Sequence, residues 1–267
     1  MQKNNNIATT HNRLSVQVTL TGLSFLVSTP KAEAVFFSEK IFPSQYTPQE
    51  LLLEIEKEIT SNDVLKQCEE VCIIYANTTY TLVPDALFDD KRLSEYLKFN
   101  SKILAGDYIA YDTLTAQSIH VVYVPLINVN NYLFDTFGSF KYYHATSVLL
   151  QYVFEKLPVK SATKAFIQVY DGHFDLLILK NGSLLLCNSY SYKTPEDLAY
   201  YVLFAIEQLQ LKPETIETSV LGAIEETDPN FEILYTYIRN LSVLNVTGFT
   251  VTPQAKPHQQ LLLKNCF

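Results

Sequence analysis

The most constraining feature of this 267-residue chain is a set of three apolar runs between Ala165 and Tyr190, joined by two short turns. The turns are Asp171-Gly172 and Asn181-Gly182. Both dipeptides tolerate the positive φ values that a two-residue type I′ turn requires, so they predict two tight hairpins. The stretch is therefore predicted to be a three-stranded antiparallel meander.

The residues after the meander predict two helices and two further strands. Thr194 caps a helix that begins at Pro195 and runs to about residue 211. Apolar runs and helical periodicity then predict a strand at 218–224, a helix at 231–244 and a last strand at 248–251.

The first part of the chain has a similar order. Alternating apolar residues predict a hairpin over 14–28 that turns at Thr21-Gly22, followed by a strand at 34–37. Thr47, Pro48 and Glu50 form a capping box that begins a helix, and the apolar run 71–75 predicts a buried, parallel strand. One or two helices are expected within 84–100, strands at 108–111 and 118–124, an Asn-rich loop at 128–131, and a helix at 145–157 that Pro158 ends.

Each part thus reads as strand, strand, strand, helix, strand, helix, strand. This repeated order predicts an α/β protein that arose by internal duplication. We expect residues 1–13 to be a flexible tail, 14–157 the first half and 158–267 the second half, with the boundary within 158–164.

Composition narrows the functional classes. The chain has 28 Asp and Glu against 20 Lys and Arg and no basic stripe, which argues against a nucleic-acid partner. No apolar run is long enough for a signal peptide or a membrane span. The four cysteines lack the spacing of a disulfide framework. We therefore expect a cytoplasmic protein.

With this element order, the chain resembles a bacterial family of unknown function that has the actin-like ATPase fold, the fold of actin, sugar kinases and heat-shock chaperones. The resemblance covers residues 13–253 and implies two ribonuclease H-like halves. In that fold, an Asp-x-Gly hairpin in each half holds a nucleotide phosphate, the Asp helps to organise Mg²⁺, and a glycine pair in a later turn contacts the adenosine.

This sequence departs from the motifs that the resemblance implies. The first turn is Leu20-Thr21-Gly22 and has no carboxylate, whereas in the second turn Asp171 and Gly172 are adjacent rather than separated. The adenosine motif falls at Gly222, a single glycine. If nucleotide binds, Gly22, Asp171, Gly172 and Gly222 are the expected contacts. No catalytic residue and no metal ligand is predicted.

Several polar residues have two interpretations. Asp171 and Asp175 could hold a metal or act as a base, but a turn residue and a solvent-facing strand residue explain them as well. His173 could complete this cluster or be an exposed histidine, and His120 is expected to be a satisfied, partly buried residue. The acidic run 225–228 could hold a cation or supply the first turn of a helix.

Tyrosines concentrate in the second half. They could form an interface, because tyrosine is favoured in binding surfaces, or they could fill a core that contains no tryptophan. The residues are Tyr190, Tyr192, Tyr200, Tyr201, Tyr235 and Tyr237.

Three functional hypotheses follow. The first is a non-catalytic actin-like protein that needs no cofactor and binds a protein or peptide through its cleft or a sheet edge. The second is an ATP- and Mg²⁺-binding protein or weak ATPase that uses the cleft. The third is a metal-independent enzyme that acts on a small molecule. The missing carboxylate at Thr21 favours the first hypothesis.

Overall fold

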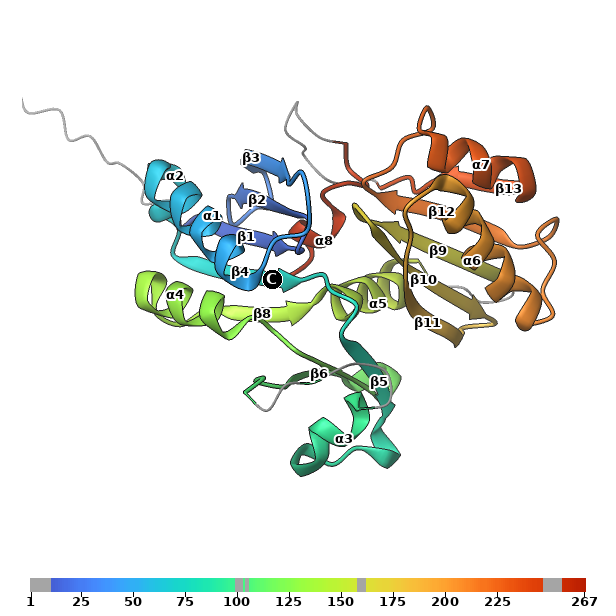
Figure 1. The fold of residues 1–267 in the computed structure, drawn as a ribbon, viewed down its shortest axis with the longest axis horizontal. Helices are drawn as coiled ribbons and strands as arrows, with labels where there is room; N and C mark the ends of the chain where they lie inside the picture. The colour runs from blue at the N-terminus through green and yellow to red at the C-terminus, as the bar shows by residue number, and fades with distance from the viewer. Residues whose placement is uncertain (1–10, 99–102, 104–105, 158–161, 247–255) are drawn as a thin grey trace, which may run out of the picture.

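The computed structural model of the chain describes residues 11–98, 103, 106–157, 162–246 and 256–267, and it contains two five-stranded sheets (Figure 1). In each sheet, three antiparallel strands are extended by two parallel ones, and the strand order is equivalent in the two sheets. The duplicated α/β architecture predicted from the sequence is therefore confirmed.

The first sheet has the order β3-β2-β1-β4-β8, and its strands are β1 (Arg13–Val18), β2 (Gly22–Ser28), β3 (Ala34–Ile41), β4 (Glu70–Tyr75) and β8 (Lys141–His144). The second has the order β11-β10-β9-β12-β13, with β9 (Thr163–Val169), β10 (His173–Lys180), β11 (Ser183–Ser191), β12 (Glu217–Gly222) and β13 (Asn240–Val243).

Helices cover the sheets and fill the space between them (Figure 1). Those beside the first sheet are α1 (Pro48–Ser61), α2 (Asp63–Lys66) and α4 (Ile127–Phe137), and those on the outer face of the second sheet are α6 (Pro195–Gln208) and α7 (Pro229–Tyr237). Helices α5 (Ala145–Lys156) and α8 (Leu261–Lys264) lie between the two sheets. Phe166 and Leu177 of the second sheet belong to the same buried cluster as the first sheet, so the two halves share a core.

A small sheet is inserted between β4 and α4 and lies at the bottom of Figure 1. Its order is β5-β7-β6, and Val83, Leu97 and Val122 form a core of its own. Its elements are β5 (Tyr80–Pro84), η1 (Asp85–Leu87), η2 (Asp90–Arg92), α3 (Leu93–Leu97), β6 (Ala110–Leu114), η3 (Thr115–Gln117) and β7 (Ile119–Tyr123).

The helix starts predicted from capping residues are confirmed. Thr47 accepts a hydrogen bond from the backbone N–H of Glu50, whose carboxylate in turn accepts one from the backbone of Thr47. Thr194 and Asp197 form the same reciprocal pair at the start of α6. Each pair satisfies backbone donors that the first helical turn leaves free.

Only one of the two predicted type I′ turns has that geometry. Asn181 and Gly182 both have positive φ values, 50° and 82°, as a type I′ turn requires. In the other turn Gly172 has a φ of 79°, but Asp171 is not in the positive region, so the type I′ prediction is wrong there. The backbone of Asp171 instead contacts the first half of the chain.

The Asn-rich segment predicted to be a loop is helix α4. Val129 and Leu133 are buried on one side of it, and the Asn130 side chain accepts a 2.6 Å hydrogen bond from the Tyr75 hydroxyl. Tertiary contacts thus stabilise asparagines that have low helix propensity. The predicted helix 231–244 was also wrong in its second half: α7 ends at Tyr237, and residues 240–243 form β13 against β12.

Other element boundaries differ as well. The region 84–100 contains short 3₁₀ turns and the five-residue α3, and the predicted strand at 108–111 is observed as Ala110–Leu114. Strands β5 and β8 were not predicted, because both are short and carry polar residues. The predicted strand 248–251, most of the predicted tail and residues 158–161 of the boundary lie outside the described residues.

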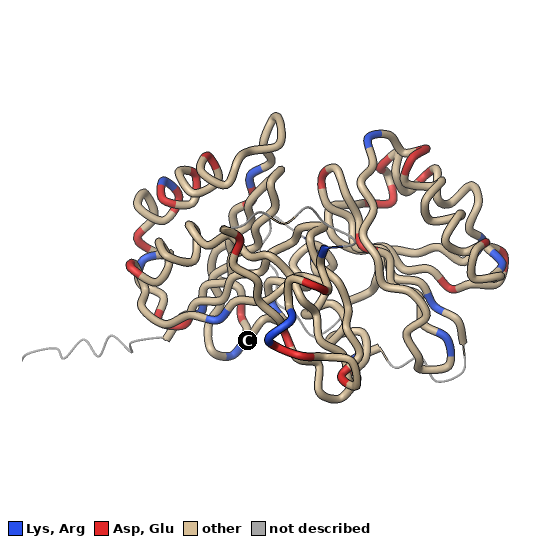
Figure 2. Tube along the Cα trace, turned by 60° about the horizontal axis from the view of Figure 1, so that its bottom comes forward, with Lys and Arg blue, Asp and Glu red and all other residues tan. Residues whose placement is uncertain are grey.

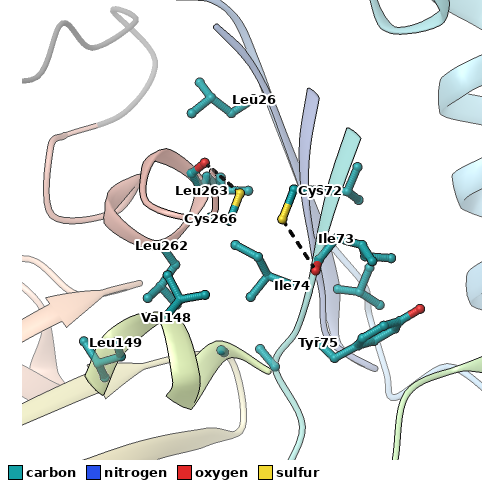
Figure 3. Packing of buried hydrophobic residues seen from close by; sticks show 14 of the residues in the cluster. Leu26, Cys72, Ile73, Ile74, Tyr75, Val148, Leu149, Leu262, Leu263 and Cys266 are labelled. Atoms are coloured by element: carbon teal, nitrogen blue, oxygen red, sulfur yellow. Dashed lines mark hydrogen bonds between the residues drawn. The ribbon is translucent and has the colours of Figure 1, made fainter. Parts of the chain in front are cut away.

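The end of the chain packs against the first half. Leu261, Leu262, Leu263 and Cys266 are buried. Figure 3 shows Leu262 beside Val148 of α5 and Cys266 opposite Cys72 of β4. The Cys266 thiol donates a 3.3 Å hydrogen bond to the Ser15 hydroxyl in β1. In the described part of the chain, no helix is long and apolar enough to cross a membrane.

Candidate functional site

Four chain segments meet in the cleft between the sheets because each follows a parallel strand at its carboxyl end. The β1–β2 turn contains Thr21, the β9–β10 turn contains Asp171, and Gly222 ends β12. Residues 76–79 follow β4 at the same edge. This edge is where open α/β sheets bind ligands, so the cleft is the candidate site.

The two hairpin turns of the cleft touch each other. The Thr21 hydroxyl donates a 2.8 Å hydrogen bond to the backbone carbonyl of Asp171, which lies 150 positions further along the chain. A Cβ atom built on Gly172 would lie 4.0 Å from the Thr21 methyl group. A phosphate group could enter between the turns only if Thr21 and Asp171 moved apart.

The glycines at the predicted contacts also have packing roles. A Cβ atom on Gly22 would lie 2.8 Å from the Lys40 carbonyl oxygen, so Gly22 permits the close approach of β3. Gly222 has a φ of 85°, and its Cβ atom would lie 2.2 Å from Gln168 Nε2 and 2.3 Å from the Val169 carbonyl. Both positions need glycine for the fold itself.

The C-terminal segment of the chain covers the turn after β12, where the adenosine motif was expected. The backbone N–H of Gly222 donates a 3.2 Å hydrogen bond to the carbonyl of His258. The His258 side chain is buried and hydrogen-bonds through Nε2 to the Ile224 carbonyl at 2.9 Å. Lys256 pairs with Glu225 at 2.6 Å, so this carboxylate of the acidic run has a cationic partner within the chain.

Two cavities adjoin the contact between Thr21 and Asp171. Gly22, Asp171 and Gly222 line a cavity of about 50 Å³, well below the several hundred Å³ of most small-molecule sites. Asp171 and Gly172 line the second, of about 800 Å³. The structure thus brings all four predicted residues to one place. The larger cavity is also lined by polar residues, among them Ser44, Gln45, Asn77, Thr78, Thr79, Ser191 and Lys193.

Asp175 is buried, which contradicts the prediction that it faces solvent. Its exposed fraction is 2%, and burial raises the pKa of its carboxyl group to about 7. It is hydrogen-bonded to Ser189, to the Thr146 hydroxyl at 3.4 Å and to the Tyr170 hydroxyl at 3.5 Å. The signal was the nearly unbroken apolar run of β10, which is typical of a strand covered on both faces.

His173 is likewise buried rather than exposed. Its ring stacks on Tyr170 with 4.5 Å between the ring centroids, and burial lowers its pKa to about 4. His120 confirms its prediction, because it is buried and hydrogen-bonds Thr113 at 3.2 Å and Asp85 at 2.8 Å.

A buried polar network connects the second sheet to α5 and the insertion. The hydroxyls of Ser189 and Tyr80 are hydrogen-bonded at 3.1 Å, and the Tyr80 ring lies against His144 at 4.4 Å. Burial lowers the pKa of His144 to about 3. The Asp112 carboxylate accepts a 2.8 Å hydrogen bond from the His144 backbone, and burial raises its pKa to about 6. These groups hold three parts of the fold together.

The tyrosines of the second half fall into two groups. Tyr190, Tyr192 and Tyr201 pack against the second core, whereas Tyr200, Tyr235 and Tyr237 are exposed. Lys and Arg residues are interspersed with Asp and Glu along the described chain (Figure 2). Among the described residues, no group of three or more His, Cys, Asp or Glu side chains is placed to hold a metal ion.

Comparisons with known proteins agree with this architecture. The sequence model of a family described as "Protein of unknown function (DUF3822)" matches residues 1–241. A Bacteroides thetaiotaomicron crystal structure, described as having an actin-like ATPase fold and unknown function, superposes with a TM-score of 0.79 at 20% identity and covers 96% of each chain. No curated protein matches the sequence.

Two further solved structures share the fold at low identity. The PilM–PilN type IV pilus biogenesis complex gives a TM-score of 0.61 at 12% identity, with 95% of this chain and 94% of that chain covered. The ethanolamine utilization protein EutJ from Carboxydothermus hydrogenoformans gives 0.52 at 7% identity, with 96% and 88% covered. The fold is therefore the actin-like ATPase fold.

Proposed function

Because this chain belongs to the DUF3822 family of proteins of unknown function and has an actin-like fold, we propose that it is a non-catalytic module that binds a protein or peptide. Its nucleotide site is degenerate. Fold alone does not confer activity, so the proposal depends on the site.

The observation that carries the proposal is the contact between Thr21 and Asp171. This 2.8 Å hydrogen bond joins the two hairpin turns that, by the resemblance to the actin-like fold, are expected to hold a nucleotide phosphate between them. The first turn lacks the carboxylate that would organise a magnesium ion. On the adenosine side, the segment around His258 lies against Gly222 and leaves a cavity of about 50 Å³.

A binding role is supported by two further observations. One structure of the same fold is itself a complex of two proteins, PilM and PilN. In this chain, the exposed tyrosines of the second half are side chains that are enriched in protein interfaces.

The four cysteines are unpaired, as is usual in the reducing cytoplasm, where we place the protein.

Thermal unfolding with and without millimolar ATP and Mg²⁺ tests the proposal that the chain does not bind nucleotide. We expect no change in melting temperature for the natural chain or for Asp171→Ala. A ligand present at a hundred times its Kd stabilises by about 2.7 kcal/mol, roughly five degrees or more for a chain of this size. An increase of that size that Asp171→Ala abolishes would establish the alternative, an ATP- and Mg²⁺-binding protein or weak ATPase.

Affinity enrichment from a lysate of the host cell tests the proposal that the chain binds a protein. We expect the chain to recover a specific protein at the same yield with ATP, with ADP and after nucleotide removal. Recovery that depends on ATP, or no protein above the level retained by the empty matrix, would contradict the proposal.

A further inference from the structure

Exposed aromatic side chains gather on the two outer helices of the second half. Tyr200, Phe204, Tyr235 and Tyr237 are exposed by 61%, 45%, 62% and 54%. Of these, the first two lie on α6 and the others on α7, and the helices pack side by side on the outer face of the second sheet (Figure 1). Tyr235 and Tyr237 are two positions apart, so they point to different sides of α7. Exposed aromatic rings on neighbouring helices are typical of a binding surface.

Three of these rings, those of Tyr200, Phe204 and Tyr235, stack on another ring of the chain. Tyr200 stacks on Phe204 with 6.0 Å between ring centroids, and Tyr235 stacks on the buried Phe231 at 5.9 Å. Side chains held in this way lose little conformational freedom when a partner binds, so more of the contact energy remains for affinity.

The charge on these helices has one sign. α6 and α7 contain Asp and Glu residues but neither Lys nor Arg. The exposed carboxylates are Glu196, Glu207 and Glu232. Along α6, Glu196, Tyr200 and Phe204 are spaced by four residues, so their side chains lie in one row on the helix surface. Glu207 continues the row three residues after Phe204, so the two aromatic rings have a glutamate at each end. Glu232 and Tyr235 are three apart on α7 and also share a face.

We propose that this α6–α7 face binds a basic segment of another protein, rich in arginine. The guanidinium group fits both features of the face, because it stacks on tyrosine rings and pairs with carboxylates. A purely apolar segment would leave the glutamates buried without partners. A second copy of this chain would bring like charges together, and an anionic membrane would be repelled. The inference rests on the binding role proposed above and specifies the chemistry of its partner.

The test is a fluorescence anisotropy titration with three labelled 15-residue peptides that repeat Gly-Arg-Leu, Gly-Lys-Leu or Gly-Glu-Leu. We expect saturable binding of the arginine peptide, weaker binding of the lysine peptide and none of the glutamate peptide. The double variant Tyr200→Ser/Tyr235→Ser should weaken binding of the arginine peptide at least tenfold. Phe134→Ser, which removes an exposed ring from α4, should leave it unchanged.

A matched pair of charge variants separates the site from the net charge of the chain. Glu196→Gln/Glu207→Gln/Glu232→Gln should weaken binding at least fivefold. A control triple that neutralises exposed glutamates outside the second half should change it less than twofold, and it is Glu33→Gln/Glu39→Gln/Glu155→Gln. Thermal unfolding of each variant checks that it is folded.

Four results would overturn the proposal: no saturable binding of the arginine peptide, equal binding of the glutamate peptide, equal losses in the two charge triples, or no effect of the tyrosine double variant. A fifth such result comes from sedimentation equilibrium. If the natural chain is a dimer and the tyrosine double variant is a monomer, a second copy of the chain covers the face and the proposal is wrong. If the peptide tests contradict the α6–α7 site while affinity enrichment still recovers a partner, the proposed binding function stands and only the site is wrong. If ATP binds in the unfolding test above, the proposed function is wrong, and the peptide titration still shows whether the α6–α7 face binds arginine.

Discussion

Tyr80 of the inserted sheet and Ser189 of β11 lie 109 positions apart in the sequence, yet their hydroxyls form a 3.1 Å hydrogen bond. The bond ties the insertion to the second sheet, with Tyr80 only 6% exposed. Removing a buried hydroxyl that is hydrogen-bonded costs about 1 kcal/mol. We therefore expect Tyr80→Phe to lower the free energy of unfolding by about that amount in urea denaturation. Tyr111→Phe, at an exposed ring in the same insertion, should change it by less than about 0.5 kcal/mol. Equal effects of the two variants would mean that the bond does not contribute.

The buried carboxyl group of Asp175 should make stability depend on pH. Burial raises its pKa in the folded state from the ordinary value of 3.8 to about 7. Between these values the folded state holds a proton that the unfolded state has lost, so the contribution of Asp175 to stability falls as pH rises through this window and is constant above it. Each pKa unit corresponds to ~1.4 kcal/mol.

Asp175→Asn removes this titration and keeps the shape of the side chain. The variant's stability relative to the natural chain should therefore increase between pH 5 and pH 8, measured by urea denaturation. The difference isolates Asp175 from His144 and His173, whose lowered pKa values have the opposite effect on the natural chain, stabilising it as pH rises towards 6.5. A difference that does not change with pH would show that Asp175 is ionised throughout.

The last residues of the chain should contribute to the stability of the first half. Leu262 is 2% exposed, in the core shared with β1 and β4, whereas Leu185 on β11 is 40% exposed. Replacing a buried leucine by alanine costs about 2–5 kcal/mol. We expect Leu262→Ala to lose that much and Leu185→Ala less than about 1 kcal/mol in urea denaturation. Hydrogen exchange should show the Leu262→Ala loss in β1 and β2, and protection unchanged there would contradict this packing.

For this chain, the sequence predicts helix starts and turns better than it predicts which side chains are buried and what they contact. Capping residues and the Asn181-Gly182 turn depend on neighbours a few positions away, and these predictions are confirmed. The helix at Asn130 depends on Tyr75 and the polar contacts of Asp175 on Thr146, which are distant in the sequence. The apolar run of β10 indicates that Asp175 is covered, but no local pattern identifies these partners.

The candidate site shows the same division. Its four predicted residues do meet at the cleft, because the fold places equivalent turns together. What the sequence could not indicate is that Thr21 bonds to Asp171 or that His258 returns to cover Gly222. Both contacts join segments that no short motif links.

Gly222 offers a direct test of how tightly the turn after β12 is packed. It has a φ of 85°, and a Cβ atom there would lie 2.3 Å from the Val169 carbonyl, a backbone atom that cannot move aside alone. Gly138 has a similar φ of 75° but open space around it. A residue other than glycine held at such a positive φ costs about 1–3 kcal/mol, which applies at both positions, and overpacking adds about 1–3 kcal/mol more at Gly222. We therefore expect Gly138→Ala to lose about 1–3 kcal/mol of unfolding free energy and Gly222→Ala to lose at least about 1 kcal/mol more than Gly138→Ala. Similar losses in urea denaturation would mean that the C-terminal segment and β9 yield to the added methyl group, and that the turn has room to open.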